Sequence, residues 1–317
     1  MMMGQELNFS IIIPLYNKEL YIERAIYSVQ SQIITNWELI IVDDGSTDDS
    51  IQRISDLQDK RINVIKQSNQ GEAAARNRGI KEVKNEIICF LDADDYWSPD
   101  FLLEISRLAN KYPQAEIYIP NYCIEYNGNH YHHKIRGLDR CQEDGILSNF
   151  YETITGNYWI INSSCNAIKR ERLLMMDKFF PVGSTVYCDF DFWLRLCPHS
   201  IIAYSKKVCA YYCREVGNNT RVSHHKKIIW SNALYETINE ILVDPNIGEN
   251  RKYILEFLDR RIGVYIISMI IANKKKDALR SLHSWHPKNK YYIYKYVFLL
   301  FVLLPSSFME HIYYAKK

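Results

Sequence analysis

Residues 87–95 read IICFLDADD, an apolar run that ends abruptly in Asp92, Asp94 and Asp95. Apolar runs bounded by polar residues are typical of buried strands, so three carboxylates are expected where this strand ends. Such a cluster repels itself unless a cation or hydrogen-bond donors neutralise it. Oxygen ligands of this kind suit Mg²⁺ or Mn²⁺ rather than zinc, and Mg²⁺ completes its shell with water and substrate phosphates. The segment therefore predicts a divalent metal, bound by Asp92, Asp94 and Asp95, that holds a diphosphate at the edge of a sheet.

Two further apolar runs, residues 8–13 and 38–42, are expected to form strands that also end in candidate binding residues. Those residues are Pro14, Tyr16, Asn17, Asp43 and Asp44. In open α/β sheets, ligands bind outside the carboxyl ends of the strands. A ring, amides and carboxylates at three neighbouring strand ends would therefore form one nucleotide pocket. Each stretch alone also has a simpler interpretation, as a solvated acidic turn, a helix-capping turn or, for Tyr16, ordinary packing.

Four segments, taken in this order, resemble motifs of the family 2 glycosyltransferases. They read IIIPLYN (residues 11–17), WELIIVDDGSTDDS (37–50), NQGEAAARNRGI (69–80) and IICFLDADDYWSPDFL (87–102). The resemblance covers roughly residues 8–215. It implies a GT-A fold and transfer of a sugar from a nucleotide diphosphate with inversion at the anomeric carbon. It also implies that the nucleotide sugar is bound by Pro14, Tyr16, Asn17, Asp43, Asp44, Arg76, Asp92 and Ala93.

Strand and helix patterns alternate over residues 8–120. This alternation predicts an α/β fold, a mainly parallel sheet with helices on both faces, which agrees with the Rossmann-like sheet of the GT-A fold. We predict a GT-A domain over residues 1–225, with a nucleotide-sugar half at 8–120 and an acceptor half at 121–225. A helical C-terminal extension is expected over residues 226–317.

The composition is that of a folded protein without a strong overall charge. The chain has 317 residues, 47% of them hydrophobic, and a formal net charge of +2, so no global field indicates nucleic acid as a partner. Its eight cysteines form no C-x-x-C pair, which indicates reduced thiols in a cytoplasmic protein. The N-terminus, MMMGQELNFS, has no basic region followed by an apolar stretch, so secretion is not expected.

Residues 188–195, CDFDFWLR, resemble the start of a helix on the family's acceptor side. The resemblance places Asp189 at the family's catalytic aspartate, the general base that takes the proton of the acceptor. Cys188 stands where the family commonly has glutamate. From the residues alone, Asp189 would be interpreted as a helix cap. Residues 158–169 resemble the family's acceptor-side segment.

Histidines in two places are further candidates for binding a metal or a phosphate. Residues 211–225 resemble the family's loop over the bound donor, but Val216 stands where many members carry histidine. His224 or His225 would serve instead, and a solvated loop is the alternative. The HYHH motif at residues 130–133 would form a metal cluster or, more simply, belong to one tyrosine-rich loop.

The most hydrophobic part of the C-terminal extension is residues 291–304, YYIYKYVFLLFVLL. Only residues 296–304 are uninterrupted, well short of the roughly 20 residues that span a bilayer. Tyrosines flank this run, as do the lysines Lys288, Lys290, Lys295, Lys316 and Lys317. Aromatic and basic flanks around a short apolar run favour an interfacial helix, and a buried core helix is the alternative.

The resemblance implies an inverting transferase of bacterial O-antigen or capsule polysaccharide synthesis. We expect a hexose, with UDP-glucose or UDP-galactose as the favoured donor, to pass to a saccharide carried on undecaprenyl diphosphate. A peripheral contact of the C-terminal helix would place the enzyme at the cytoplasmic face of the inner membrane. Two other classes stay open. A nucleotidyltransferase usually needs a glycine- and lysine-rich phosphate loop, which residues 14–18 are not. The other is a non-catalytic carbohydrate-binding protein on a transferase scaffold.

Overall fold

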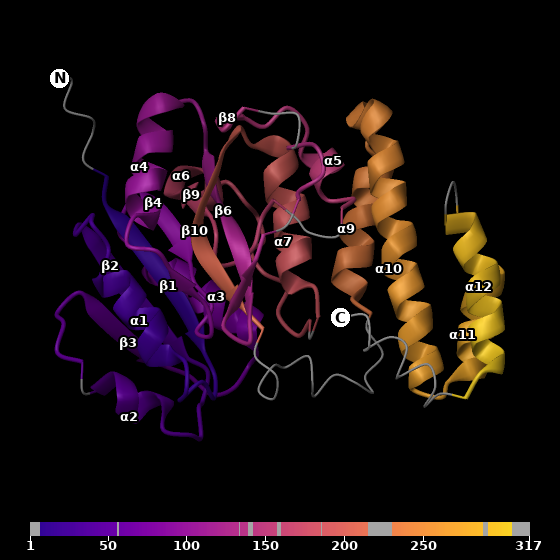
Figure 1. Ribbon diagram of the computed structural model, residues 1–317, viewed down its shortest axis with the longest axis horizontal. Coiled ribbons are helices and arrows are strands. Elements are labelled where there is room, and N and C mark those ends of the chain that lie inside the picture. Colours follow the sequence, from indigo (N-terminus) through magenta and orange to yellow (C-terminus); the bar gives the residue numbers. More distant parts are fainter. Residues whose placement is uncertain are drawn as a thin grey trace. The chain divides into compact units, whose positions relative to one another are not determined.

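The structure is a computed structural model that describes residues 7–55, 57–132, 134–138, 142–156, 160–184, 186–214, 230–287 and 291–305. The chain divides into two compact units, Met1–Glu215 (unit 1) and Val216–Lys317 (unit 2). Figure 1 shows strands and helices in unit 1 and helices in unit 2.

Unit 1 is built on one sheet, whose strands follow the order β3-β2-β1-β4-β9-β6-β10-β5, with β7 paired to β6 and β8 paired to β10. The strands are β1 Phe9–Leu15, β2 Trp37–Asp43, β3 Ile62–Lys66, β4 Ile87–Phe90, β5 Tyr96–Trp97, β6 Ile117–Tyr126, β7 Asn129–Tyr131, β8 Asp144–Ile146, β9 Ala167–Lys169 and β10 Ile202–Cys213. β3, β2, β1 and β4 run parallel, and β6 runs parallel to β10. The central sheet is thus mainly parallel, with β9 inserted antiparallel between β4 and β6.

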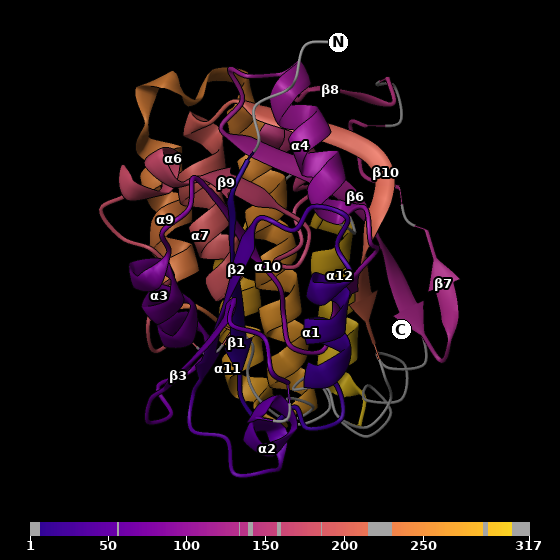
Figure 2. The ribbon, with the colours of Figure 1, turned by 90° about the vertical axis from the view of Figure 1, so that its left-hand side faces the viewer.

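Helices cover both faces of this sheet, which confirms the predicted α/β fold class. They are α1 Ile22–Gln30, α2 Ser50–Ser55, α3 Glu72–Glu82, α4 Phe101–Lys111, α5 Phe150–Thr153, α6 Arg170–Leu174 and α7 Cys188–Leu196, with the 3-10 turn η1 Cys197–His199. Figure 2 shows α1 and α4 on one side of β1 and β2, and α3 and α7 on the other side.

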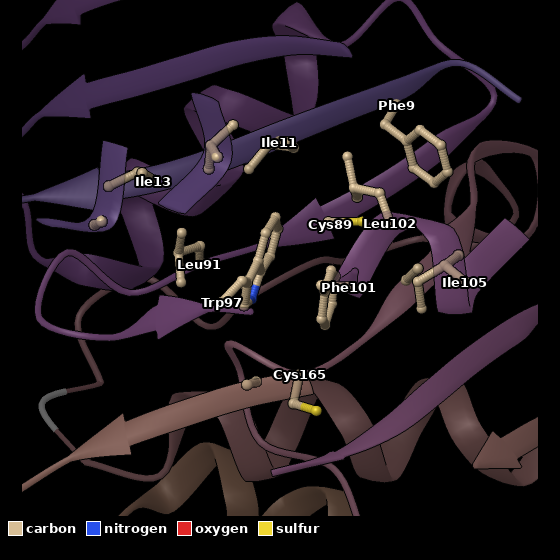
Figure 3. Packing of buried hydrophobic residues seen from close by; sticks show 14 of the residues in the cluster. Phe9, Ile11, Ile13, Cys89, Leu91, Trp97, Phe101, Leu102, Ile105 and Cys165 are labelled. Carbon is tan, nitrogen blue, oxygen red and sulfur yellow. The ribbon is translucent and has the colours of Figure 1, made fainter. Parts of the chain in front are cut away.

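Alternate residues of β1 face the two helix layers. Ile11 and Ile13 lie in one core with Trp97 and with Phe101 and Ile105 of α4 (Figure 3). The same core takes the apolar face of α1, which consists of Ile22, Ala25, Ile26 and Val29. This is the face that helical spacing predicts. Its burial stabilises a helix that is too short to be stable in isolation.

On the opposite face of the sheet, Ile12 of β1 lies against α3. A Cβ atom at Gly79 would lie 2.5 Å from Cγ2 of Ile12, so only glycine lets this helix approach the strand so closely. Phe90 of β4 packs edge-on against Phe180 and Phe192, with ring centroids 5.4 and 6.2 Å apart. These ring contacts hold α7 against β4.

β6 extends beyond its short opening run IYIP, residues 117–120. It continues to Tyr126 because it pairs with β10 and forms a hairpin with β7. Pro120 has no N–H to give to a strand ladder, and the register between β6 and β10 shifts between Ile119 and Asn121. The proline therefore lies opposite a bulge in β10, where the ladder is interrupted and no N–H from β6 is needed.

Unit 2 consists, among the described residues, of α9 Asn232–Val243, α10 Arg251–Ile271, α11 Lys275–Ser284, α12 Tyr291–Leu303 and the 3-10 segment η2 Pro245–Asn250. Phe298 and Val302 of α12 are buried in a core with residues of α10 and α11. On its other side, α12 leaves Ile293, Leu300 and Leu303 exposed at 68%, 63% and 79%. None of the described helices is both long and apolar enough to cross a membrane.

Gly79→Ala is expected to destabilise unit 1, because the new methyl group would collide with Ile12. Overpacking of a core typically costs about 1–3 kcal/mol, and the better helix propensity of alanine returns up to ~1 kcal/mol. The measurement is the denaturant midpoint followed by far-ultraviolet circular dichroism. Lys81→Ala, at an exposed position of the same helix, is the control. Equal midpoints for Gly79→Ala and the wild type would show that α3 moves off β1 without cost.

Candidate active site at the ends of the strands

The loops that follow β1, β2 and β4 meet at one edge of the sheet. β1 pairs with β2 on one side and with β4 on the other, and ligands of open α/β sheets bind at such a switch in strand order. The N–H of Asp44 donates to the carbonyl of Leu15 (2.8 Å), and the N–H of Leu91 donates to the carbonyl of Ile12 (3.0 Å). The three strand ends that the sequence analysis singles out therefore lie together.

Asn17 belongs to the framework of this edge. It adopts a left-handed φ of 51°, its N–H donates to Oγ of Ser46 (3.1 Å), and its Oδ1 accepts from the N–H of Thr47 (2.8 Å). These bonds tie the loop after β1 to the loop after β2. Pro14 is buried within β1, whereas Tyr16 is 46% exposed, so the ring of Tyr16 is accessible to a ligand.

The two aspartates at the end of β2 are both buried but have different partners. Asp44 accepts from the N–H groups of Gln70 (2.9 Å) and Gly71 (2.7 Å) and from the side-chain amide of Gln67 (2.8 Å). Both oxygens of Asp44 thus hold the loop before α3. Asp43 accepts at Oδ1 from one backbone N–H of its own turn (2.9 Å).

Asp92 and Arg76 form the centre of the site. Nη2 of Arg76 lies 2.5 Å from Oδ1 of Asp92 and 2.5 Å from Oε1 of Glu72, and the guanidinium lies over the ring of Phe180, 5.2 Å from its centroid. The Arg76 side chain is 1% exposed, yet its Nε and Nη1 have no hydrogen-bond partner among the described residues. Buried donors without partners are costly. This guanidinium is therefore suited to donate to an anionic ligand.

The charge around Asp92 favours an additional cation. Burial raises the pKa of Asp92, Arg76 opposes this shift, and Glu72 and Asp94 add to it, so that the pKa reaches about 6. Burial is the largest cause of this shift because it disfavours the charged form of a carboxyl group. A cation bound beside Asp92 would favour that charged form.

Asp94 is paired with a lysine that the sequence analysis did not single out. Nζ of Lys18 lies 2.5 Å from Oδ2 of Asp94, and Arg24 donates to the carbonyl of Asp94 (2.7 Å). Burial alone would lower the pKa of Lys18, but the charges of Asp94, Asp92 and Asp95 raise it above its ordinary value. The Lys18 ammonium is thus held in its charged form beside the acidic cluster.

Asp95 faces the protein interior and is fully buried. Its Oδ2 accepts from Oγ of Ser164 (2.5 Å) and its Oδ1 from the N–H of Cys213 (2.9 Å). Oγ of Ser164 also accepts from the N–H of Asp92 (3.0 Å). Burial, with the charges of Asp94 and Asp92, raises the pKa of Asp95 well above its ordinary value. Asp95 therefore ties the loop after β4 to β10 and to the segment before β9.

The candidate metal ligands have unlike surroundings. In the described parts of the chain, no group of three or more histidine, cysteine, aspartate or glutamate side chains is arranged to hold a metal ion. The side chains of Asp92 and Asp94 are 24% and 23% exposed, whereas both oxygens of Asp95 have protein donors. One or two carboxylates, completed by water and substrate phosphates, are the usual protein share of a Mg²⁺ site. The oxygens of Asp92 and Asp94 fit that donor set, and Mn²⁺ accepts the same one.

The first turn of α7 carries two aspartates with different partners. Asp191 is buried and pairs with Arg195 (2.6 Å), which also donates to carbonyls of the segment before α7. Asp189 is partly exposed and lies in the field of Arg76 and Asp92. Burial raises the pKa of Asp189, Arg76 opposes the shift, and Asp92 adds to it. A carboxylate with a raised pKa is a stronger base.

Asp189 is not the residue at the N-cap of α7. The N-cap is Tyr187, with a left-handed φ of 58°, and the helix starts at Cys188. The Cys188 side chain is buried, and burial raises the pKa of its thiol. Cys188 thus contributes a neutral group where the family commonly has glutamate.

Part of the expected acceptor side lies outside the described residues, namely His133, Tyr158, Val216, His224 and His225. In the described part of the HYHH motif, His130 lies 3.8 Å from Glu125 and its ring centroid lies 5.1 Å from that of Tyr211. Tyr211 stacks on Tyr96 at 4.5 Å, and the Tyr96 hydroxyl donates to Glu125 (2.6 Å). His130 therefore belongs to an aromatic cluster around a carboxylate.

Several residues that neutralise or orient the carboxylates are not among the candidates predicted from the sequence, namely Lys18, Arg24, Glu72, Ser164 and Cys213. Lys18 directly follows Asn17, and Glu72 lies one helical turn before Arg76, so local position was a usable signal for these two. Ser164 and Cys213 lie 69 and 118 residues from Asp95, and nothing local marks them.

Comparisons with known protein sequences identify the family. The family described as "Glycosyl transferase family 2" matches residues 10–174, which is more than half of the chain. Glycosyltransferase GlyA of Streptococcus pneumoniae serotype 4 is 28% identical over 283 residues, which are 85% of this chain and 38% of that protein. Glycosyltransferase GlyG of the same organism is 32% identical over 176 residues, which are 54% of this chain and 57% of that protein. The chain thus spans less than two thirds of the length of these curated relatives.

Solved structures share the fold. Staphylococcus aureus TarS 1–349 in complex with UDP-GlcNAc has a TM-score of 0.67 at 20% identity, covering 87% of this chain and 81% of that chain. The mannosyltransferase PcManGT of Pyrobaculum calidifontis, in complex with GDP-Man and Mn²⁺, has a TM-score of 0.56 at 15% identity, covering 94% and 86%. Unit 1 therefore has the GT-A fold. With the family match over more than half of its length, the chain belongs to glycosyl transferase family 2.

Proposed function

We propose that the protein transfers a hexose from a UDP-sugar to a hydroxyl group of a saccharide acceptor, with inversion at the anomeric carbon. The observation that carries this proposal is the buried Arg76 guanidinium, which pairs with Asp92 and in whose field Asp189 lies. A leaving diphosphate needs donors where its charge develops, and an attacking hydroxyl needs a base. Arg76 and Asp189 supply these two groups in one region of unit 1.

The donor pocket is assigned to the ends of β1 and β2. Tyr16, with its exposed ring, stacks on the uracil, and Asp43 accepts from the base. We favour Asp43 over Asp44 because both oxygens of Asp44 hold the loop before α3. The unpaired donors of Arg76 bind the diphosphate. The remaining residues shape the pocket through the backbone and the loops, and they are Pro14, Asn17 and Ala93.

The bound UDP-GlcNAc in TarS supports a UDP-sugar donor in this protein. UDP-glucose and UDP-galactose are the first donors to test. The transfer of an α-linked nucleotide sugar with inversion gives a β-linked product.

A divalent ion, Mn²⁺ or Mg²⁺, would be held by Asp94 and Asp92, whose side chains are partly exposed. The Mn²⁺ bound in PcManGT supports this assignment. When bound, the ion acts as a Lewis acid that neutralises the leaving diphosphate. Arg76 orients the Asp92 carboxylate. We assign Asp95 a role in the shape of the loop, because its oxygens already accept from Ser164 and Cys213.

Asp189 is assigned the role of base. The acceptor oxygen attacks the anomeric carbon opposite the diphosphate, Asp189 takes the hydroxyl proton, and the bond to the diphosphate oxygen breaks with its electron pair on that oxygen. Holding the acceptor and the anomeric carbon in line lowers the entropy cost of this step. Asp191 is not assigned this role because it is buried and paired with Arg195.

We further propose a lipid-linked acceptor, a saccharide on undecaprenyl diphosphate in O-antigen or capsule synthesis, at the cytoplasmic face of the bacterial inner membrane. The support is α12, which is apolar on both of its sides. Phe298 and Val302 are buried in unit 2, while Ile293, Leu300 and Leu303 are exposed. Apolar side chains gathered on an exposed helix face are typical of membrane-surface helices.

Asp94→Asn is expected to abolish detectable transfer, and EDTA to do the same until Mn²⁺ or Mg²⁺ is restored. The physical reason is the loss of the charge that would hold the ion beside the diphosphate. The assay measures UDP release from a panel of UDP-sugars, with and without saccharide acceptor. Asp49→Asn, an exposed site in another loop, is the control. Full activity of the metal-free protein would refute the proposed use of a metal.

Asp189→Asn is expected to lower turnover by about 10²–10⁴, the range for losing general base catalysis, while UDP binding measured by calorimetry is kept. The wild-type rate should rise with pH as Asp189 ionises. Because the pKa of Asp189 is raised, this acid limb should lie at higher pH than for an ordinary aspartate, and Asp189→Asn should remove it.

The matched variant is Asp191→Asn, which breaks the pair with Arg195. It should lower the melting temperature and leave most of the turnover of the folded protein. A large loss of turnover in folded Asp191→Asn together with a small loss in Asp189→Asn would mean that Asp191, and not Asp189, is the base.

Replacing Ile293, Leu300 and Leu303 together by serine is expected to reduce the fraction of protein that floats with anionic liposomes, because it removes apolar area from the exposed face of α12. Salt should weaken wild-type binding in part. UDP binding should be unchanged. The control is Val243→Ser with Leu279→Ser, which replaces exposed apolar residues elsewhere in unit 2. Equal flotation of the triple variant and the wild type would refute this role of α12.

A further inference from the structure

Asp94 is already neutralised by a cation that the chain itself provides. The ammonium of Lys18 lies 2.5 Å from Oδ2 of Asp94, and the two side chains are only 17% and 23% exposed. Asp94 is also the partly exposed carboxylate proposed above to hold a divalent ion. The same carboxylate therefore has two candidate cations, one resident and one from solution.

The backbone of Lys18 is fixed, so the ammonium reaches Asp94 from a rigid base. Its N–H donates to Oγ of Ser50 (2.8 Å), and the next N–H, that of Glu19, donates to Oδ2 of Asp48 (3.0 Å). Both acceptors belong to the loop and helix start after β2. The Lys18 side chain can move away from Asp94 while the backbone hydrogen bonds of Lys18 and Glu19 stay in place.

A divalent ion and an ammonium repel each other when both contact one carboxylate. Two like charges a few ångströms apart near a protein surface repel each other strongly. A divalent ion that binds Oδ2, the oxygen that Lys18 contacts, would take the place of the ammonium and move it away. Loss of the ion pair then opposes binding of the metal.

We propose that Lys18 is a positioning residue that occupies Asp94 in the empty enzyme and is displaced when the divalent ion binds, so that metal and nucleotide diphosphate bind cooperatively. Bound alone, the ion leaves the ammonium without its partner. Bound with a diphosphate, it brings phosphate oxygens that serve the displaced ammonium as a new anionic partner. The inference rests on the proposed role of Asp94 as a metal ligand.

The test is binding of Mn²⁺ to the full chain, measured by electron paramagnetic resonance with and without UDP. Lys18→Met should bind Mn²⁺ alone about two- to fivefold more tightly than the wild type, the range for releasing a partly exposed ion pair. Addition of UDP should tighten Mn²⁺ binding less in Lys18→Met than in the wild type. By reciprocity, Mn²⁺ should also tighten UDP binding less in this variant.

Two further variants serve as references. Lys18→Arg keeps a cation at this position and should show the same cooperativity between Mn²⁺ and UDP as the wild type. Lys81→Met removes one exposed positive charge in α3 and should change neither constant. The melting temperature of each metal-free variant shows that it is folded.

Unchanged or weaker binding of Mn²⁺ alone to folded Lys18→Met would overturn the inference, as would full cooperativity with UDP in that variant. A different result would refute the proposed use of a metal. Wild-type protein that binds no Mn²⁺ even in the presence of UDP would overturn the metal site, and the inference with it.

Discussion

The burial of negative charge at the end of β4 is the constraint on which the rest of the site depends. Asp92, Asp94 and Asp95 lie within four residues of one another, and a buried carboxylate without partners is strongly destabilising. Each is compensated by a different element. Arg76 of α3 pairs with Asp92, Lys18 of the loop after β1 pairs with Asp94, and donors from β10 and the segment before β9 reach Asp95. The acidic cluster thus depends on the assembly of segments that are far apart in the sequence.

Packing and electrostatics are coupled through α3. Arg76 lies one helical turn before Gly79, and the absence of a side chain at Gly79 lets the helix lie against Ile12 of β1. The same close approach brings the Arg76 guanidinium to 2.5 Å from Asp92. At the start of the helix, Asp44 holds the preceding loop through Gly71. A helix fixed at both ends holds the Arg76 cation beside Asp92 before a ligand arrives.

The sequence predicts those features that depend on local patterns. The continuous apolar runs that form β1, β2 and β4 and the apolar face of α1 are local, and the α/β fold class with its helix-covered sheet follows from the alternation of strands and helices. The partners of the carboxylates are not local, because their donors lie up to 118 residues away. The length of β6 does not follow from local pattern either, because pairing with β10 carries the strand past its opening apolar run. Likewise, the spacing of apolar residues along α12 does not reveal which of them are buried and which are exposed.

At three places in this site, two nearby aspartates have different roles, one structural and one proposed for ligand, metal or base chemistry. The pairs are Asp43 with Asp44, Asp94 with Asp95, and Asp189 with Asp191. In each pair, the second member is buried and accepts from protein donors that fix a loop or a helix start. The first member is the one assigned to ligand, metal or base chemistry. Burial and hydrogen-bond donors, and not the type of side chain, thus distinguish the roles of these aspartates. A backbone fixed by one carboxylate orients its neighbour in advance, which reduces the entropy lost when the substrate binds.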